Sequence, residues 1–298
     1  MTTLSRTIHL LRVDLPDRLR TYWPLIKSLQ TGLLLLTGLA GFASARCPVL
    51  ELPTLLGLAG SLFLAISGST ILNMVYDRDI DRKMARTAHR PLPAGEIDAD
   101  QALLIGLMLS WLGVGWAVAL SPLYGLVVFA GLFFDVVVYT IWLKRRTPWS
   151  IVWGGISGGM PILAGRVLGI GQIDLTGILL ALAVLLWIPT HIMTFSMRYY
   201  NDYRRAGVPT FPATYGFQTT RLIIALSSLG AALTMGAAAF LIGLTWGYLR
   251  VLFVLSAGLL VLAVTSVLQP SEKLNMGLFK YASIYMLSSM LLVLVEMV

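Results

Sequence analysis

The stretch "STILNMVYDRDIDRKMARTAHRPLPAGEI", residues 69–97, begins as the end of an apolar run and then becomes strongly charged. Asp77, Asp79 and Asp81 stand within five positions, and cationic side chains follow them up to an "RPLPAG" turn. A long apolar segment that ends in charge in this way is typical of a helix that leaves a lipid bilayer. The stretch therefore predicts a membrane fold and raises the question of what three acids do at its edge.

The composition of the whole chain supports this interpretation. The 298 residues have a mean hydropathy of +0.81, with 57% hydrophobic and only 12% charged residues. A soluble domain carries about 25% charged residues. Helices are the expected spanning form, because backbone polar groups are not left unpaired in lipid. The net charge of +8 favours contact with anionic headgroups over nucleic acid, since no soluble domain presents a binding face.

Hydrophobic stretches long enough to cross a bilayer recur along the entire chain. They predict an all-α membrane protein whose single domain, residues 1–298, is a bundle of nine transmembrane helices. The nine predicted spans are 26–45, 52–73, 102–120, 122–143, 150–170, 176–196, 221–244, 248–269 and 278–297. Residues 1–25 precede them as a cytoplasmic or interfacial segment, with Leu11, Leu15 and Leu19 on one side.

The distribution of cations predicts the orientation of the bundle in the cell membrane. Of the 22 Lys and Arg residues, all but Arg46, Arg166 and Arg250 fall on the side of the amino terminus. The positive-inside rule makes that side cytoplasmic and places the carboxyl terminus outside. The charged edge of residues 77–90 then opens to the cytoplasm. The single Cys47 excludes an intramolecular disulfide and a multi-cysteine metal site.

The acids of the opening stretch are spaced for a helix. Asn73, Asp77 and Asp81 follow at i, i+4 and i+8, so two further turns of the second span place them on one face, with Asp79 elsewhere. Like charges at this spacing repel, which favours a hard cation among the oxygens, and Mg²⁺ prefers one or two carboxylates plus phosphate oxygens. The alternative is that Asp77 and Asp81 pair with the neighbouring cations Arg78, Arg82 and Lys83.

A second polar edge follows the sixth span, in "HIMTFSMRYYNDYRRAGVPTFP". Here Asn201 and Asp202 are followed by cations and a Gly–Pro-rich turn, an order that weakly echoes residues 77–95. Two such edges facing each other would form one mouth with cation-binding oxygens on opposite walls. Ionisable groups at a membrane edge are candidates for function.

These residues carry a resemblance to a known family. "NMVYDRDIDRKMARTAHRPLPAG" resembles the first aspartate-rich motif, NxxxDxxxD, of the UbiA superfamily of intramembrane prenyltransferases. The similarity continues in "VYTIWLKRRTPWSIVWGGISGGMPILAG" (138–165) and "THIMTFSMRYYNDYRRAGVPTFP" (190–212), most closely with the haem O synthases, or protoheme IX farnesyltransferases. The resemblance implies a bundle around a central cavity and Mg²⁺-dependent transfer of a prenyl group from its diphosphate, farnesyl or longer, to a hydrophobic acceptor.

The resemblance also implies roles for individual residues. Asp77, Asp81 and Lys144 would be catalytic, and Tyr139 and His191 would lie on the acceptor side. Magnesium ligands would be Asn73, Asp77, Asp81 and Asp202. Diphosphate contacts would come from Lys144, Arg86, Arg90 and Lys27. Haem B is the favoured acceptor, with an aromatic quinone precursor of the 4-hydroxybenzoate type or a lipid as the alternatives.

Several positions depart from the family pattern. Asn201 stands where the family shows a second acid, which would weaken a second magnesium site. Asp135 and Arg166 replace apolar or aromatic residues, and "IPTHIMTF" replaces a more aromatic stretch around His191. A transporter or a non-catalytic assembly factor are the competing classes. The position of the acids at one membrane edge disfavours the first, and the intact Asn73, Asp77, Asp81 and Lys144 disfavour the second.

Overall fold

The computed structural model describes residues 22–46 and 51–297, and the described chain is almost entirely helical. Most of the expected interfacial segment and Cys47 lie outside these residues. Nine helices within the described part are long and apolar enough to span a membrane. The prediction of an all-α membrane protein with nine spans is therefore confirmed.

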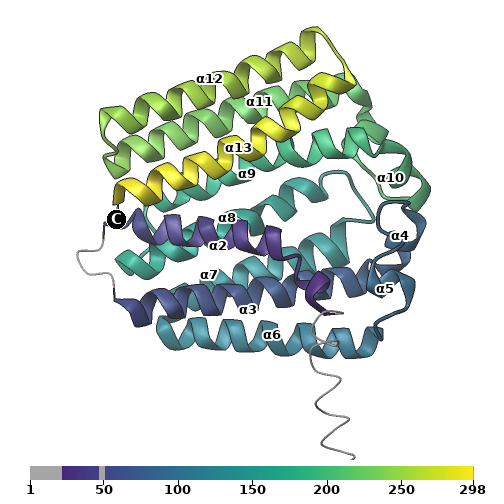
Figure 1. The fold of residues 1–298 in the computed structure, drawn as a ribbon, viewed down its shortest axis with the longest axis horizontal. Helices are drawn as coiled ribbons and strands as arrows, with labels where there is room; N and C mark the ends of the chain where they lie inside the picture. The colour runs from purple at the N-terminus through teal and green to yellow at the C-terminus, as the bar shows by residue number, and fades with distance from the viewer. Residues whose placement is uncertain (1–21, 47–50, 298) are drawn as a thin grey trace, which may run out of the picture.

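The helices follow one another with short connections (Figure 1). A 3-10 turn, η1 (Trp23–Ile26), leads into the first span, and η2 (Phe134–Leu143) is a π-helix that continues α7. The spanning helices are α2 (Ser28–Ala43), α3 (Leu52–Tyr76), α6 (Ala99–Leu120), α7 (Pro122–Phe133) with η2, α8 (Ser150–Ile170), α9 (Leu175–Arg198), α11 (Phe211–Ile242), α12 (Trp246–Leu268) and α13 (Glu272–Met297). The short helices are α4 (Arg78–Lys83), α5 (Pro91–Ala94) and α10 (Tyr200–Ala206).

The predicted boundaries agree with most of these helices but miss two starts. The seventh span begins at Phe211 rather than 221, and the ninth at Glu272 rather than 278. The residues before 221 include Pro212, Gly216 and the polar run 218–220, and the ninth helix opens on Glu272 and Lys273, so both starts lie outside the apolar runs from which a span is predicted. Within α11 the chain bends at Gly216, whose φ of 79° is in the left-handed region that favours glycine.

Two apolar clusters hold the bundle together. The larger is built mainly from α9, α11, α12 and α13, with Tyr285 and Leu259 fully buried. The second joins α2, α3, α7 and α8 around Tyr124 and Leu58. The hydroxyl of Tyr124 lies 2.8 Å from Ser61 Oγ, so the buried polar tip has a partner.

The seam between α2 and α8 depends on small residues. A Cβ at Gly165 would lie 1.9 Å from the backbone oxygen of Gly38, and a Cβ at Gly41 would lie 2.0 Å from that of Ile162. Membrane helices pack through such small residues because lipid supplies no hydrophobic drive to press them together. The seam fixes α2 against α8 along the half of the bundle near Ala43.

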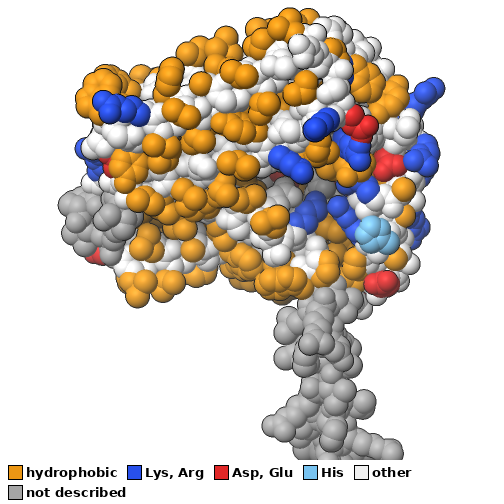
Figure 2. All heavy atoms as spheres, turned by 45° about the horizontal axis from the view of Figure 1, so that its top comes forward, with side chains coloured by type: hydrophobic (Ala, Val, Ile, Leu, Met, Phe, Trp, Pro, Cys, Tyr) orange, Lys and Arg blue, Asp and Glu red, His pale blue; other side chains and the backbone are white. Residues whose placement is uncertain are grey.

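The two ends of the bundle differ in charge. We name the end where α3 passes into α4 the motif end; α5 and α10 lie there too, at the right of Figure 1. The opposite end, where α2, α8 and α13 finish, we name the distal end. Figure 2 shows blue and red side chains gathered toward one end of the visible face, with hydrophobic side chains over most of the remainder.

Candidate active site

The acid row lies at the junction of α3 and α4. Although α3 ends at Tyr76, the backbone N–H of Asp77 still bonds to Asn73 O and that of Asp81 to Asp77 O, both at 2.9 Å. Helical hydrogen bonding therefore continues through the junction and keeps the three residues in one row. Asp77 and Asp81 are buried, at 2% and 8% exposure, whereas the Asp79 side chain is 53% exposed. Asp79 thus lies on a different face from Asp77 and Asp81, as the spacing predicts.

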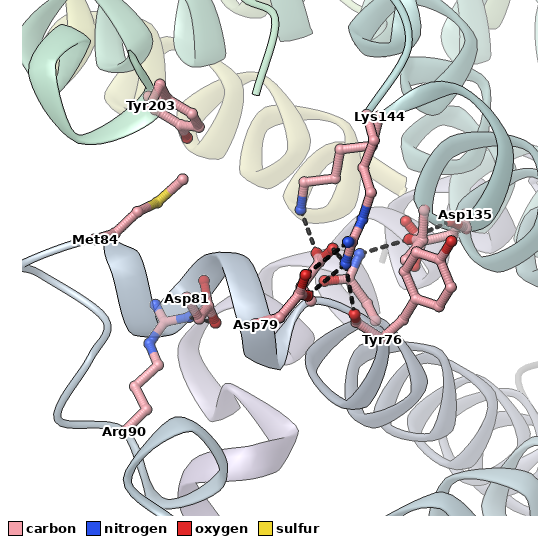
Figure 3. A network of polar contacts seen from close by, with 12 residues as sticks. Tyr76, Asp79, Asp81, Met84, Arg90, Asp135, Lys144 and Tyr203 are labelled. Carbon is pink, nitrogen blue, oxygen red and sulfur yellow. Dashed lines mark hydrogen bonds and ion pairs between the residues drawn. The ribbon is translucent and has the colours of Figure 1, made fainter. Parts of the chain in front are cut away.

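Asp77 pairs with a lysine from a distant part of the sequence. Lys144, which follows η2, donates from Nζ to Asp77 Oδ2, and Figure 3 shows its ammonium reaching toward the acids of the motif. The other carboxylate oxygen, Asp77 Oδ1, is buried with no hydrogen-bond partner. Burial lowers the pKa of Lys144, but the Tyr139 oxygen and the Asp77 carboxylate raise it by more, so the pKa lies above its ordinary value. Lys144 is therefore charged.

Asp81 is held by the turn that follows α4. Arg90 Nη1 lies 3.3 Å from Asp81 Oδ2, and the Thr87 hydroxyl donates to the Asp81 backbone oxygen at 2.9 Å. The neighbouring Arg82 instead donates to the backbone oxygen of Pro93 at 2.8 Å. Asp77 and Asp81 thus pair with Lys144 and Arg90 rather than with the adjacent Arg78, Arg82 and Lys83 of the alternative.

The third acid, Asp79, belongs to a surface ion pair. Both of its oxygens accept from the Arg145 guanidinium, at 2.6 and 2.8 Å. Arg145 also lies over the Tyr76 ring, 4.7 Å from its centroid. The hydrogen bonds from Arg145 hold the pKa of Asp79 below its ordinary value. Asp79 is thus satisfied by protein groups, in contrast to Asp77.

The oxygens of the row fit a hard divalent cation. Asn73, Asp77 and Asp81 offer an amide and two carboxylates, and the unpartnered Asp77 Oδ1 lacks the ligand that a buried oxygen requires. Mg²⁺ binds through one or two carboxylates together with substrate phosphate oxygens. Within residues 22–46 and 51–297, no three His, Cys, Asp or Glu side chains are grouped to hold a metal ion. The row itself offers two carboxylates and one amide, so substrate phosphate oxygens would complete the coordination of such a metal.

Asp202 does not continue the helix that carries His191. A continuous helix would place His191, Phe195, Arg198 and Asp202 on one stripe, but α9 ends at Arg198 and Tyr199 breaks the helix before α10. Asp202 is buried, and its Oδ1 accepts from Arg205 at 2.9 Å. Its element α10 nonetheless packs on α4 in the motif end, through an apolar cluster of Ile80, Met84, Ala206 and Val208.

Arg86 lies against a group of aromatic rings. Its guanidinium carbon is 5.0 Å from the Phe195 ring centroid, 5.5 Å from that of Tyr199 and 5.6 Å from that of Tyr203. Its Nε is buried without a hydrogen-bond partner. The contact between Arg86 and these rings is not among the predictions made from the sequence. The feature of the sequence that indicates such a group is the spacing of Phe195, Tyr199 and Tyr203, which follow one another every four residues from the end of α9 into α10.

Lys27 reaches the same region from the first span. It joins η1 to α2 with a φ of 44°, an uncommon conformation for a residue with a side chain. Its ammonium interacts electrostatically with Arg90, Lys144, Asp135 and Asp81. The structure thus gathers four cations at the motif end, Lys27, Arg86, Arg90 and Lys144, from three separate parts of the chain.

The two residues expected on the acceptor side occupy different surroundings. His191 is stacked between Trp187 and Phe279, with ring centroids at 4.9 and 4.5 Å, and its Nδ1 lies 3.2 Å from Ser283 Oγ. The Tyr139 ring instead lies 5.3 Å from Lys144 Nζ. Tyr139 therefore belongs with the motif-end cations, while His191 lies deeper, between α9 and α13.

Arg166 lies at the distal end and has no part in this site. Its Nε and Nη2 donate to the two oxygens of Asp174, at 2.7 and 2.6 Å, and its Nη1 donates to the Ser44 backbone oxygen at 2.6 Å. These hydrogen bonds from Arg166 hold the pKa of Asp174 below its ordinary value. A shallow pocket of about 510 Å³ at the same end is lined by Arg46, Thr245, Tyr248, Val295 and Glu296.

Comparisons with known sequences identify relatives of this arrangement. A family profile described as the UbiA prenyltransferase family matches residues 34–286. The chain is 40% identical over 222 residues to the protoheme IX farnesyltransferase of Korarchaeum cryptofilum, covering 74% of each chain. The match therefore extends over most of the bundle.

Solved structures share the fold at low sequence identity. A structure reported for digeranylgeranylglyceryl phosphate synthase superposes with a TM-score of 0.79 at 19% identity, covering 94% of this chain and 99% of that one. A UbiA homologue from Archaeoglobus fulgidus, bound to GPP and Mg²⁺, gives 0.68 at 18% identity and covers 92% and 99%. At this identity the superpositions establish the fold alone.

Proposed function

The chain belongs to the UbiA prenyltransferase family, and we propose that it transfers a farnesyl group from farnesyl diphosphate to haem B, giving haem O. The protein is a multi-pass membrane enzyme, and nine helices within the described residues are long and apolar enough to span a membrane. The observation that carries the proposal is the row of Asn73 with the buried Asp77 and Asp81, in which Asp77 Oδ1 has no hydrogen-bond partner beside the charged Lys144.

The acid row would hold the metal that the reaction needs. Asn73, Asp77 and Asp81 would bind one Mg²⁺, and Asp202 on α10 would serve a second one with the neutral Asn201 beside it. When bound, Mg²⁺ neutralises charge that grows on the diphosphate as the allylic C–O bond breaks. The geometry of the described residues supports the first of these sites more directly, because Asp202 is paired with Arg205.

The cations of the motif end would bind and stabilise the leaving diphosphate. Lys144 would contact it directly, since its ammonium is charged and already directed at the metal ligands. Arg90 and Lys27 would add charge from two other elements, and the unpartnered Nε of Arg86 would donate a further hydrogen bond. Fixed donors aimed at developing negative charge lower the barrier most when they are desolvated. The apolar helices would shield the allylic cation from water.

The acceptor would lie deeper, toward His191. With haem B, a vinyl carbon forms a bond to C1 of the farnesyl group while the diphosphate leaves with the electron pair of the broken bond. Water then adds to the cation on the neighbouring vinyl carbon and releases a proton, leaving a hydroxyalkyl–farnesyl substituent. His191 would contact the macrocycle through its ring, as an axial ligand of the iron or as polar lining.

The choice of haem rests on sequence similarity more than on fold. The K. cryptofilum relative is 40% identical and carries haem in its name, whereas the structure reported for a glyceryl phosphate synthase shares the fold at 19% identity. Purified protein should be incubated with farnesyl diphosphate, Mg²⁺ and haem B, 4-hydroxybenzoate or a glycerophosphate lipid in parallel. We expect farnesylated haem by mass spectrometry, EDTA to abolish it and Mg²⁺ to restore it. Transfer to hydroxybenzoate or the lipid with none to haem would contradict the proposed acceptor.

The proposal places the motif end in the cytoplasm. Its support is the excess of Lys and Arg on that side of the bundle. Single cysteines can test it in a Cys47→Ser background, with Arg146→Cys at the motif end and Gln172→Cys at the distal end. A membrane-impermeant thiol reagent added outside intact cells should label position 172 and leave position 146 unmodified. Labelling of 146 alone would reverse the topology.

A further inference from the structure

The π-helix η2 faces the acid row of α3 along its length. Ser69, Asn73 and Asp77 project from α3 one turn apart, and each meets a residue of the η2 segment. Ser69 Oγ donates to Asp135 Oδ2 at 2.5 Å, Asn73 Nδ2 donates to Thr140 Oγ1 at 2.7 Å, and Lys144 pairs with Asp77. Figure 3 shows Asp135 and Lys144 along this segment.

Only a π-helix allows this register. Asp135 and Lys144 are nine residues apart, so an α-helix of 3.6 residues per turn would place them about 180° apart, on opposite faces. A π-helix closes its hydrogen bonds over five residues instead of four, which turns the chain less per residue. Lys144 N–H bonds to Tyr139 O, five residues back, at 2.8 Å. The wider turns bring Asp135, Thr140 and Lys144 to the side of α3.

Thr140 makes the middle one of these three contacts between α3 and the η2 segment. Its hydroxyl donates to the backbone oxygen of Asp135, again five residues back, at 2.7 Å. A hydroxyl has one proton, so the oxygen of Thr140 is left to accept and not to donate. The side chain of Asn73 must therefore present its NH₂ group to Thr140 and turn its carbonyl oxygen the other way. Thr140 is buried, at 0% exposure, so no water competes for these bonds.

We propose that Thr140 is a positioning residue that fixes the side-chain amide of Asn73 with its oxygen toward the magnesium site. The inference rests on the proposed function, in which Asn73 is a metal ligand. Without the Thr140 hydroxyl, the amide can rotate and offer its NH₂ group, which repels a cation. The π-helix thereby acts on the metal site without contributing a ligand to it. Groups that orient a ligand in this way typically change metal affinity by about 10- to 100-fold.

The experiment compares two substitutions that differ by the hydroxyl. Thr140→Val keeps the branched shape and removes the hydroxyl, whereas Thr140→Ser keeps the hydroxyl. Thr234→Val is the matched control, because the Thr234 hydroxyl bonds only to carbonyls of its own helix, at 2.8 and 3.2 Å. Mn²⁺ binding is measured by electron paramagnetic resonance in the full-length protein with farnesyl thiodiphosphate, which does not react. This readout is independent of turnover.

We expect Thr140→Val to weaken Mn²⁺ binding by about 10- to 100-fold, and Thr140→Ser and Thr234→Val to stay within threefold of wild type. Asn73→Ala should weaken Mn²⁺ binding at least as much as Thr140→Val. The double variant Asn73→Ala/Thr140→Val should weaken it no further, because each change alone already withdraws the Asn73 amide oxygen from the metal. Unchanged binding in Thr140→Val, or additive losses in the double variant, would overturn the inference. If wild type binds no Mn²⁺, or Asp77→Asn leaves binding unchanged, the proposed metal site itself fails, and the role of Thr140 with it.

Discussion

Two ion pairs, one at each end of the bundle, are built from similar residues and differ in how completely their carboxylate oxygens are hydrogen-bonded. At the distal end, both oxygens of Asp174 accept from Arg166, and Oδ1 also accepts from the N–H of Gly177, at 2.8 Å. At the motif end, Asp77 Oδ2 accepts from Lys144, while the buried Oδ1 accepts no hydrogen bond and lies 3.9 Å from Arg145 Nη2. Both carboxylate oxygens of the first pair accept hydrogen bonds, whereas only one carboxylate oxygen of the second pair does.

The difference separates stability from function. Arg166 ties the end of α2, through Ser44, to the connection before α9, so its hydrogen bonds all serve the fold. A buried carboxylate oxygen without a hydrogen bond costs free energy in the folded protein. A bound ligand that contacts this oxygen would offset that cost. Removal of a charge should therefore affect turnover at the motif end and unfolding at the distal end.

The largest expected effect concerns the unpartnered acid. Asp77→Asn should lower farnesyl transfer by roughly 10³-fold, in line with the loss of an essential group that stabilises charge in the transition state. Asp79→Asn is the matched control, because Asp79 is exposed and paired with Arg145. Initial rates at saturating Mg²⁺ and the thermal unfolding midpoint in detergent are measured for both. Comparable rates for the two variants would remove Asp77 from the metal site.

The second prediction tests the distal pair. Arg166→Met keeps much of the side-chain volume but leaves the partly exposed Asp174 beside an apolar group. Breaking a buried pair is strongly destabilising, and with partial exposure of Asp174 we expect a loss of about 2–3 kcal/mol in the free energy of unfolding. Transfer at 25 °C should stay within about threefold of wild type, less than about 1.4 kcal/mol in the activation free energy. Arg166 lies at the opposite end of the bundle from the acid row, so its loss leaves the groups of that row in place.

The companion variant for Arg166 is Asp174→Asn, which retains an acceptor for the N–H of Gly177. A smaller loss of stability is expected, with the same activity. If either variant lost transfer activity without any change in unfolding, the distal pair would belong to the functional site and the contrast between the ends would be wrong.

The third prediction concerns the region between the two ends. His191→Ala should lower transfer to haem by about 10- to 30-fold, on the order of 2 kcal/mol, because a desolvated contact to the acceptor is lost. Binding of farnesyl thiodiphosphate, measured by calorimetry, should change by less than threefold, since that substrate lies at the motif end. Phe279→Leu removes one ring of the stack around His191 and serves as the structural control. Equal losses for both substrates would place His191 outside the acceptor site.

The smallest effect is expected at the exposed pair of the motif end. Arg145→Ala removes two hydrogen bonds to Asp79, but an exposed ion pair contributes only about 0–1 kcal/mol. Its unfolding midpoint should shift by little, and that shift should shrink further at 1 M NaCl because salt screens exposed charges. A large shift that salt leaves unchanged would show that Arg145 supports Asp77, whose Oδ1 lies 3.9 Å from Nη2.

Much of this protein follows from its sequence alone. The apolar runs predict nine spanning helices because a bilayer imposes both length and composition on every span. The spacing of Asn73, Asp77 and Asp81 predicts one row because helical hydrogen bonds persist through the junction of α3 and α4. The starts at Phe211 and Glu272 were missed because Pro212, Gly216 and the polar run 218–220 interrupt the hydrophobic signal in α11, and Glu272 and Lys273 do so in α13.

The tertiary structure alone decided which groups complete that row. Lys144 lies 67 residues from Asp77, and no local pattern distinguishes it from Arg78 or Arg82 as the partner. An ordinary α-helix of 3.6 residues per turn would place Asp135 and Lys144 on opposite faces, whereas the π-helix aligns both with α3. Helix type at that point depends on which hydrogen bonds form between α3 and η2, and these contacts exist only once the bundle is packed.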